Sequence, residues 1–98
     1  DMGIRIANNM MSNNVLDYLE ISDEHSIMEI RANEAITGKS LIDLDIRAKY
    51  GVNIVGITRK GEIMISPAAT EEIQADDVLL VIGADVDINR FVKKALHV

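Results

Sequence analysis

One uninterrupted apolar run, Val78 to Ile82, constrains the fold of this chain more than any other feature. A short run without a polar face is typical of a strand that is covered on both sides. The acidic stretch from Glu71 to Asp77 precedes the run and Gly83 follows it, which predicts a strand that begins after a polar loop and ends at the glycine. We therefore expect residues 78–82 to form the centre of a small sheet.

Three other segments have the composition of strands. Residues 26–31 alternate roughly between apolar and polar side chains, the pattern of a half-buried strand. Residues 53–58 and 62–65 are also strand-like, and the Arg59-Lys60-Gly61 stretch between them has the length and the glycine of a hairpin turn. Pro67 stops the second of these strands. The sequence thus predicts about four strands.

Helices are predicted in two places before the hairpin. Apolar residues recur every three or four positions from Ile4 to Tyr18, which favours an amphipathic connector helix, assigned to residues 3–20. A second helical segment can begin at a cap formed by Ser40 or Asp45. Gly51 suits the left-handed position that ends it.

A last helix is predicted at the C-terminal end. Asp85 can cap it, and Lys93 and Lys94 lie in its closing turn, where the helix dipole favours positive charge. The expected fold class is therefore α+β, with a small sheet of about four strands and a C-terminal helix, preceded by the connector helix. The domain proper is assigned to residues 25–98.

The junction between the second helix and the hairpin carries the residues best suited to a ligand. Arg47 offers a planar guanidinium and Asn53 a carboxamide, both beside apolar side chains, a combination that suits a nucleotide. Two plainer interpretations stay open. Arg47 could pair with Asp43 on the helix surface, and Asn53 could be a turn residue after Gly51.

Composition and spacing argue against catalysis and metal binding. The chain has no cysteine, which removes disulfides and thiolate chemistry and fits a cytoplasmic location. His25 and His97 stand too far apart in sequence to indicate a zinc site. The acid pairs Glu71-Glu72 and Asp76-Asp77 are expected to be solvated turn residues rather than a cation site. No Ser or Thr has a nearby histidine partner, so we do not expect an enzyme.

Charge and length limit the partners. A net charge of −6 argues against an extended nucleic-acid surface, which needs many basic contacts to phosphate. No apolar run approaches the roughly 20 residues of a membrane span, so direct membrane insertion is not expected.

Only 3% of the residues are aromatic, so the core must be built from aliphatic side chains. A core this small often gains from dimerisation.

Three motifs occur together in this chain: Arg47 to Gly61, Ile65 to Pro67, and Ala75 to Gly83. Together they resemble the C-terminal domain of RCK (regulator of conductance of potassium) proteins, most of all that of the cytoplasmic gating subunits of bacterial Ktr-type potassium transporters. The resemblance covers about residues 25–96. It implies that the segment from Ile4 to Tyr18 connects this domain to an N-terminal nucleotide-binding domain.

The resemblance implies a regulatory function. Family members form rings docked on a membrane potassium-translocating subunit, at the inner face of the cell membrane, and their C-terminal domains pair as two-fold homodimers. In the Ktr-like branch the dimer is similar to a receptor for cyclic di-AMP, whose binding inhibits potassium uptake; no other ligand or cofactor is implied. A two-fold symmetric ligand in such an interface needs the same half-site from each protomer.

The resemblance also assigns the half-site, which comprises Ile42, Asp45, Arg47, Asn53, Ile54, Pro67 and Ala68. Ile42, Ile54 and Pro67 would surround an adenine, Arg47 would contact a phosphate, and the carboxylate and carboxamide would make polar contacts. Ala68 is small and would leave room for the base. No aromatic residue is among them, so adenine packing would be aliphatic. Two alternatives stay open: a dimerisation module without its own ligand, and a sensor of another small metabolite or cation.

Overall fold

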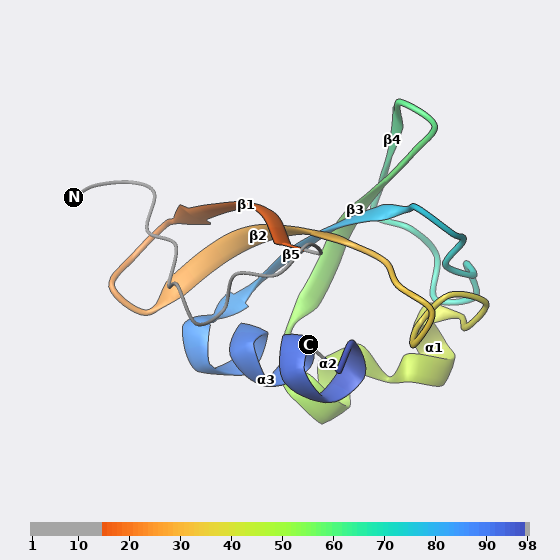
Figure 1. Ribbon diagram of the computed structural model, residues 1–98. Coiled ribbons are helices and arrows are strands. Elements are labelled where there is room, and N and C mark those ends of the chain that lie inside the picture. The colour runs from red at the N-terminus through yellow and green to blue at the C-terminus, as the bar shows by residue number, and fades with distance from the viewer. Residues whose placement is uncertain (1–14, 98) are drawn as a thin grey trace.

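A computed structural model describes residues 15–97 of the chain, and Figure 1 shows the arrangement of its elements. Five strands and three helices lie within this range. The strands are β1 (Val15–Glu20), β2 (His25–Arg31), β3 (Asn53–Arg59), β4 (Glu62–Ile65) and β5 (Val78–Ala84). The helices are α1 (Leu41–Leu44), α2 (Ile46–Tyr50) and α3 (Asp85–Ala95). None of these helices is long and apolar enough to cross a membrane.

The apolar strand β5 lies at the centre of the sheet, as predicted. The strand order is β1-β2-β5-β3-β4, and each neighbouring pair is antiparallel. Leu79 of β5 pairs with Ile30 on one side and Ile57 on the other, and all three side chains are buried. The predicted hairpin is confirmed as β3 and β4. Lys60 and Gly61 join these strands, both with positive φ (54° and 82°), as in the tight turns that match the twist of a hairpin.

The first strand is the main departure from the sequence prediction. Residues 15–20 form β1 at the edge of the sheet instead of continuing the connector helix, so the sheet has five strands rather than about four. The backbone N–H and C=O groups of β1 form hydrogen bonds with β2. A helix in this segment would have to form such bonds within itself, and its intrinsic helix propensity is weak. The rest of the predicted connector helix lies outside the described residues.

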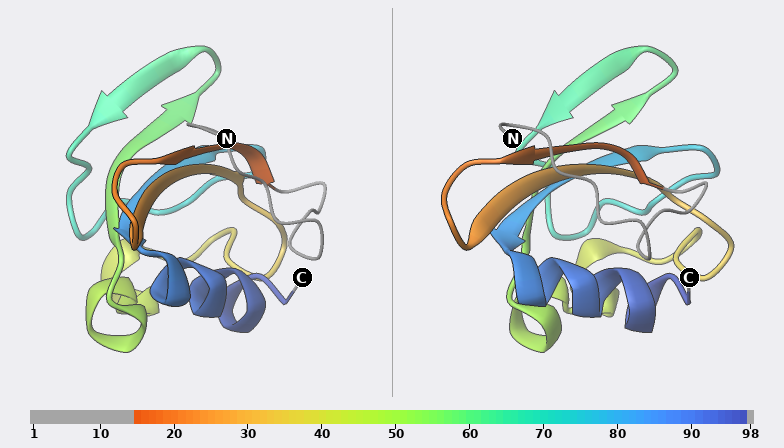
Figure 2. Two further views of the ribbon diagram at one scale, coloured as in Figure 1. Left: turned by 90° about the vertical axis from the view of Figure 1, so that its left-hand side faces the viewer. Right: turned by 60° about the vertical axis from the view of Figure 1, so that its left-hand side comes forward.

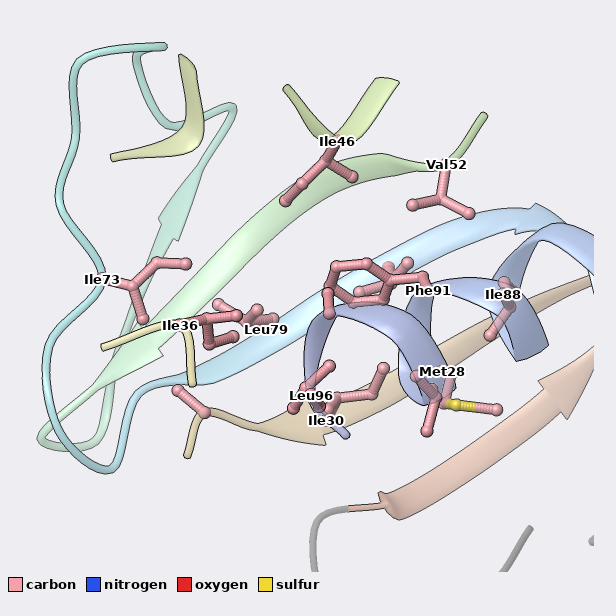
Figure 3. Packing of buried hydrophobic residues seen from close by; sticks show 14 of the residues in the cluster. Met28, Ile30, Ile36, Ile46, Val52, Ile73, Leu79, Ile88, Phe91 and Leu96 are labelled. Carbon is pink, nitrogen blue, oxygen red and sulfur yellow. The ribbon is translucent and has the colours of Figure 1, made fainter. Parts of the chain in front are cut away.

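The core lies between the curved sheet and α3, which packs under β2 and β5 (Figure 2). Among the described residues, Phe91 of α3 is the one buried aromatic residue of the core. The Tyr50 ring contacts Phe91 edge-on, with 5.5 Å between the ring centroids. The other large buried hydrophobic side chains are aliphatic or methionine, which agrees with the prediction from composition (Figure 3).

The helices around the hairpin begin and end partly as predicted. Ser40 is the cap of α1, since its Oγ accepts a hydrogen bond from the Asp43 N–H at 3.1 Å. The segment is not one helix, however, because Asp45 adopts a left-handed conformation (φ 51°) that separates α1 from α2. The predicted cap of the C-terminal helix α3 is wrong by one residue. Strand β5 continues past Gly83 to Ala84, and Ala84 rather than Asp85 takes the N-cap position of α3.

Asp85 links α3 to the first two strands. It lies in the first turn of α3, where a carboxylate interacts favourably with the helix dipole. Its Oδ1 accepts hydrogen bonds from Ser26 Oγ at 2.6 Å and from Tyr18 Oη at 3.3 Å. This residue therefore joins β1, β2 and α3, rather than capping the helix as the sequence suggested.

Gly51 ends α2 with φ 76°, as predicted, and it also lies close to α3. A Cβ at this position would lie 2.9 Å from Asp87 Oδ2. We expect Gly51→Ala to lower the free energy of unfolding by about 2 kcal/mol, because it adds left-handed strain and displaces Asp87 from its ion pair with Arg90. Urea denaturation measures the change. Gly61→Ala is the control, since Gly61 has a similar φ of 82° but open space around it, and should cost about 1 kcal/mol. Equal losses in the two variants would contradict the role of the contact.

Candidate ligand pocket

A pocket of about 280 Å³ opens where α1, α2, the start of β3 and the loop after β4 meet. Six of the seven residues assigned from the sequence line it: Ile42, Asp45, Arg47, Asn53, Ile54 and Pro67. Ala68 does not line the pocket, and the neighbouring Ala69 does. Sequence reasoning also missed Leu41, Ile46 and Val52, which complete the lining.

The pocket is apolar at its base and more exposed at its mouth. Ile46 and Val52 belong to the buried core, and Figure 3 shows both in the same cluster as Phe91. Ile42, by contrast, is 62% exposed. Because its base is part of the core, this side of the pocket cannot move without disturbing the packing of α3. A planar apolar group could rest against such a surface.

The kink between the two short helices brings lining residues of both helices together. The Asp45 N–H donates to the carbonyl oxygens of Leu41 and Ile42, and the left-handed turn at Asp45 starts α2 in a new direction. As a result Ile42 of α1 and Arg47 of α2 line the same pocket.

The Arg47 side chain has no hydrogen bond or ion pair with any described residue. The pair with Asp43 that the sequence allowed is therefore not formed. Arg47 is exposed and lines the pocket, so its five N–H donors are open to an anion. A phosphate or carboxylate group could accept two of these hydrogen bonds at once.

A β-bulge shapes the strand that carries Asn53 and Ile54. The register between β3 and β5 shifts between Ile54 and Gly56, and Val55 is the extra residue. Bulges change the direction of nearby side chains and are common beside functional sites. The Val55 carbonyl oxygen also accepts a hydrogen bond from the Ser66 N–H at 3.0 Å, where the chain leaves β4 for the loop that lines the pocket.

That loop is tied directly to α1, and Figure 1 shows the chain returning from β4 to this helix. The Ile42 N–H donates to the Ala69 carbonyl oxygen at 2.8 Å, and the Leu41 N–H donates to that of Glu71 at 3.1 Å. The first N–H groups of a helix have no partner within the helix, so the loop satisfies them. Two walls of the pocket are thus joined by backbone hydrogen bonds.

An ion-pair cluster holds the far end of the same loop. Arg59 Nε and Nη2 donate to the two oxygens of Asp77 at 2.9 and 2.8 Å, and Nη1 donates to Glu71 Oε2 at 3.0 Å. Asp77 is only 1% exposed, so the prediction that both acid pairs are solvated turn residues is wrong for this residue. Its partner lies 18 residues away, beyond the reach of a local pattern.

The cluster changes the ionisation of its buried carboxyl group. Burial acts to raise the pKa of Asp77, but hydrogen bonds from Arg59 and from the Gln74 N–H outweigh it and hold the pKa below its ordinary value. The same hydrogen bonds to Asp77 and Glu71 raise the pKa of Arg59. Both partners are therefore charged at neutral pH.

The lining of the pocket combines charged, polar and apolar side chains. Its lining has one cation, one carboxylate and one carboxamide among apolar side chains, and it has no hydroxyl, thiol, imidazole or amine. Among the described lining residues, the Asp45 carboxylate is the group that could accept a proton. Within residues 15–97, no three His, Cys, Asp or Glu side chains are grouped so that they could hold a metal ion.

Comparison with known proteins identifies relatives. Residues 26–96 match the family model of the TrkA-C domain. Ktr system potassium uptake protein C of Bacillus subtilis (strain 168) is 60% identical over 97 residues, which cover 99% of this chain and 44% of that protein. Ktr system potassium uptake protein A of the same organism is 45% identical over 91 residues, or 93% of this chain and 41% of that protein. The chain thus spans less than half the length of these relatives.

One solved structure is similar in both sequence and fold. It is the RCK C domain of the potassium transport protein KtrA in complex with cyclic diadenosine monophosphate. It is 52% identical to this chain with a TM-score of 0.69, and the match covers 72% of this chain and 84% of that one. The motifs noted in the sequence, the antiparallel sheet with its C-terminal helix and the family match all agree: the chain belongs to the TrkA-C family, the C-terminal domains of RCK proteins.

Proposed function

We propose that this chain is the sensor domain of a potassium-uptake system, and that its homodimer binds cyclic di-AMP and thereby inhibits potassium transport. One observation carries the proposal: six residues assigned to a cyclic di-AMP half-site from the sequence surround one pocket. The 52% identical KtrA domain, which was solved in complex with this ligand, supports it.

The chemistry of the pocket matches one half of the ligand. An adenine would pack against the aliphatic side chains of Ile42, Ile54 and Pro67, and the Arg47 guanidinium would bind a phosphate. The Asp45 carboxylate would accept hydrogen bonds, and the Asn53 carboxamide would both donate and accept them, at the edge of the base or at the ribose. Affinity then depends on one strong ionic contact and on apolar surface removed from water.

The size and openness of the pocket favour a shared site. Sites for drug-sized ligands usually measure about 300 to 1,000 Å³, so a pocket of about 280 Å³ is small for a whole dinucleotide. Cyclic di-AMP has two equivalent halves, and a two-fold dimer offers two equivalent pockets. Ile42 is 62% exposed at the mouth in the single chain, and a partner protomer with its share of ligand would cover it.

Regulation requires that the ligand distinguish between two arrangements of the dimer. A ligand with equal affinity for both arrangements would shift nothing, however tightly it bound. In the full-length protein, the favoured arrangement would be passed through a cytoplasmic ring to the membrane potassium-translocating subunit on which the ring docks. The domain itself would carry out no reaction.

Isothermal titration of the purified chain with cyclic di-AMP tests the proposal, with cyclic di-GMP and ATP as controls. We expect saturable binding of one ligand for each pair of chains, and no binding of the controls. A confirmed dimer that gives no heat at two temperatures would instead indicate a dimerisation module without its own ligand. Binding of ATP or of a divalent cation in place of cyclic di-AMP would indicate a different sensor.

A further inference from the structure

The side chain of Arg59 donates all of its hydrogen bonds to a single segment of the chain. This residue ends β3, and its four side-chain hydrogen bonds go to Glu71, to both oxygens of Asp77 and to the Glu72 carbonyl oxygen at 3.1 Å. All of these acceptors lie in the loop that follows β4. A planar guanidinium with several fixed donors suits such a clamp, and a lysine could not reproduce it.

The loop after β4, which Arg59 holds, also forms one wall of the ligand pocket. Glu71 binds Arg59 through its carboxylate, while its carbonyl oxygen accepts the Leu41 N–H of α1. Two residues earlier, the Ala69 carbonyl oxygen accepts the Ile42 N–H, and both of those residues line the pocket. A continuous series of hydrogen bonds therefore connects Arg59 to the wall of the pocket.

The strand that carries Arg59 also carries part of the pocket. Asn53 and Ile54, at the start of β3, line the pocket, and Arg59 is the last residue of the same strand. The loop has the reverse order, since Pro67 and Ala69 at its start line the pocket and Asp77 at its end binds Arg59. The contact between Arg59 and Asp77 thus joins the strand and the loop at the ends that lie farthest along the chain from the pocket-lining residues.

We infer that Arg59, acting through Glu71 and Asp77, is a positioning residue for the ligand site. It fixes the loop after β4 against α1 so that the Pro67 and Ala69 wall is already in place before ligand binds. Supporting interactions of this kind set the precision of a binding site even though they do not touch the ligand. The identity of the ligand used in the test rests on the proposed function, but the positioning of the loop does not.

The test uses a double variant, Arg59→Met with Asp77→Asn. Removing Arg59 alone would leave the buried Asp77 carboxylate without its cationic partner and destabilise the whole domain. The asparagine removes that charge but keeps an oxygen for the Gln74 N–H, which donates to Asp77 Oδ2 at 2.8 Å. Arg90→Met is the matched control, because it deletes an exposed arginine that pairs with Asp87 and donates to the Tyr50 carbonyl oxygen, and none of these three residues lines the pocket.

Two measurements are made on the wild-type chain and on both variants: calorimetric titration with cyclic di-AMP and amide hydrogen exchange. We expect the double variant to bind about tenfold more weakly, in the range that loss of supporting contacts costs elsewhere, with stoichiometry unchanged. The Leu41 and Ile42 amides should exchange faster, while amides between β2 and β5 keep their protection. Arg90→Met should change neither measurement.

The two readouts separate the possible failures. If the double variant binds as tightly as the wild type and its Leu41 and Ile42 amides remain protected, Arg59 does not position the loop. Faster exchange throughout the sheet would also overturn the inference, since the effect would then be on global stability. If the wild-type chain binds no cyclic di-AMP, the proposed function fails, and the exchange of these two amides still decides whether the clamp orders the loop.

Discussion

Replacing Arg47 with alanine should abolish cyclic di-AMP binding while leaving the domain folded. Loss of one charged partner from a hydrogen-bonded ion pair costs about 3 kcal/mol, roughly a hundredfold in affinity. A two-fold site would lose both guanidinium groups at once, so the loss should exceed that figure. Calorimetric titration measures the binding. The melting temperature should not fall, because Arg47 is exposed and its side chain bonds to no other described residue.

Two further variants show whether the effect belongs to the guanidinium or only to its charge. Lys49→Ala removes the same charge from the same helix, but Lys49 does not line this pocket, so affinity should stay within about threefold of wild type. Arg47→Lys keeps the charge and loses the planar fork, so its affinity should be intermediate. Binding by Arg47→Ala at wild-type strength would remove this residue from the site, and unfolding of the variant would assign it a structural role instead.

The centre of the sheet could be predicted because its signals are local. The run from Val78 to Ile82 has no polar residue, and a short apolar segment of that kind has few alternatives to a covered strand. The hairpin is equally local, since Lys60 and Gly61 supply the turn between two strand-like segments. Neither prediction required knowledge of a distant partner.

The first strand could not be predicted in the same way. Val15 and Tyr18 are three positions apart, which fits one face of a helix, and yet both pack against the core from β1. The strand exists because β2 provides a partner for its backbone, and pairing of that kind depends on the rest of the sheet rather than on the segment itself. Periodicity alone does not contain this information.

The pocket was predictable in part, for a comparable reason. The family resemblance pointed to the residues that a ligand would touch, but Ile46 and Val52 belong to the core and carry no chemical signature of a site. The link between Arg59 and Asp77 was missed because an acid beside other acids in a polar loop is usually solvated. The available signal was the position of Asp77, directly before a strand covered on both sides, where a charge needs a partner.

The single variant Arg59→Met should be the most destabilising change to this cluster, and its effect should depend on pH. At neutral pH we expect the free energy of unfolding to fall by about 3 kcal/mol, because Asp77 is left charged and buried without its partner. This loss lies at the lower end of the range for breaking a buried ion pair, because the Arg59 side chain is 21% exposed and water can reach part of the cluster. Urea denaturation between pH 7 and pH 3 measures the change.

The sign of the pH dependence follows from Asp77. In the wild type its pKa is lowered, so the stability it contributes is present above the pKa of the unfolded chain and is lost as the pH falls through the folded value. Without Arg59, burial should instead raise its pKa, so the penalty in the variant is present at neutral pH and disappears as the carboxyl takes up a proton. The stability difference between wild type and Arg59→Met should therefore shrink on acidification. A stability difference that stays constant to pH 3 would show that Asp77 is not its source. The double variant, which also carries Asp77→Asn, has no carboxyl group to protonate at this position, so it should regain no stability on acidification.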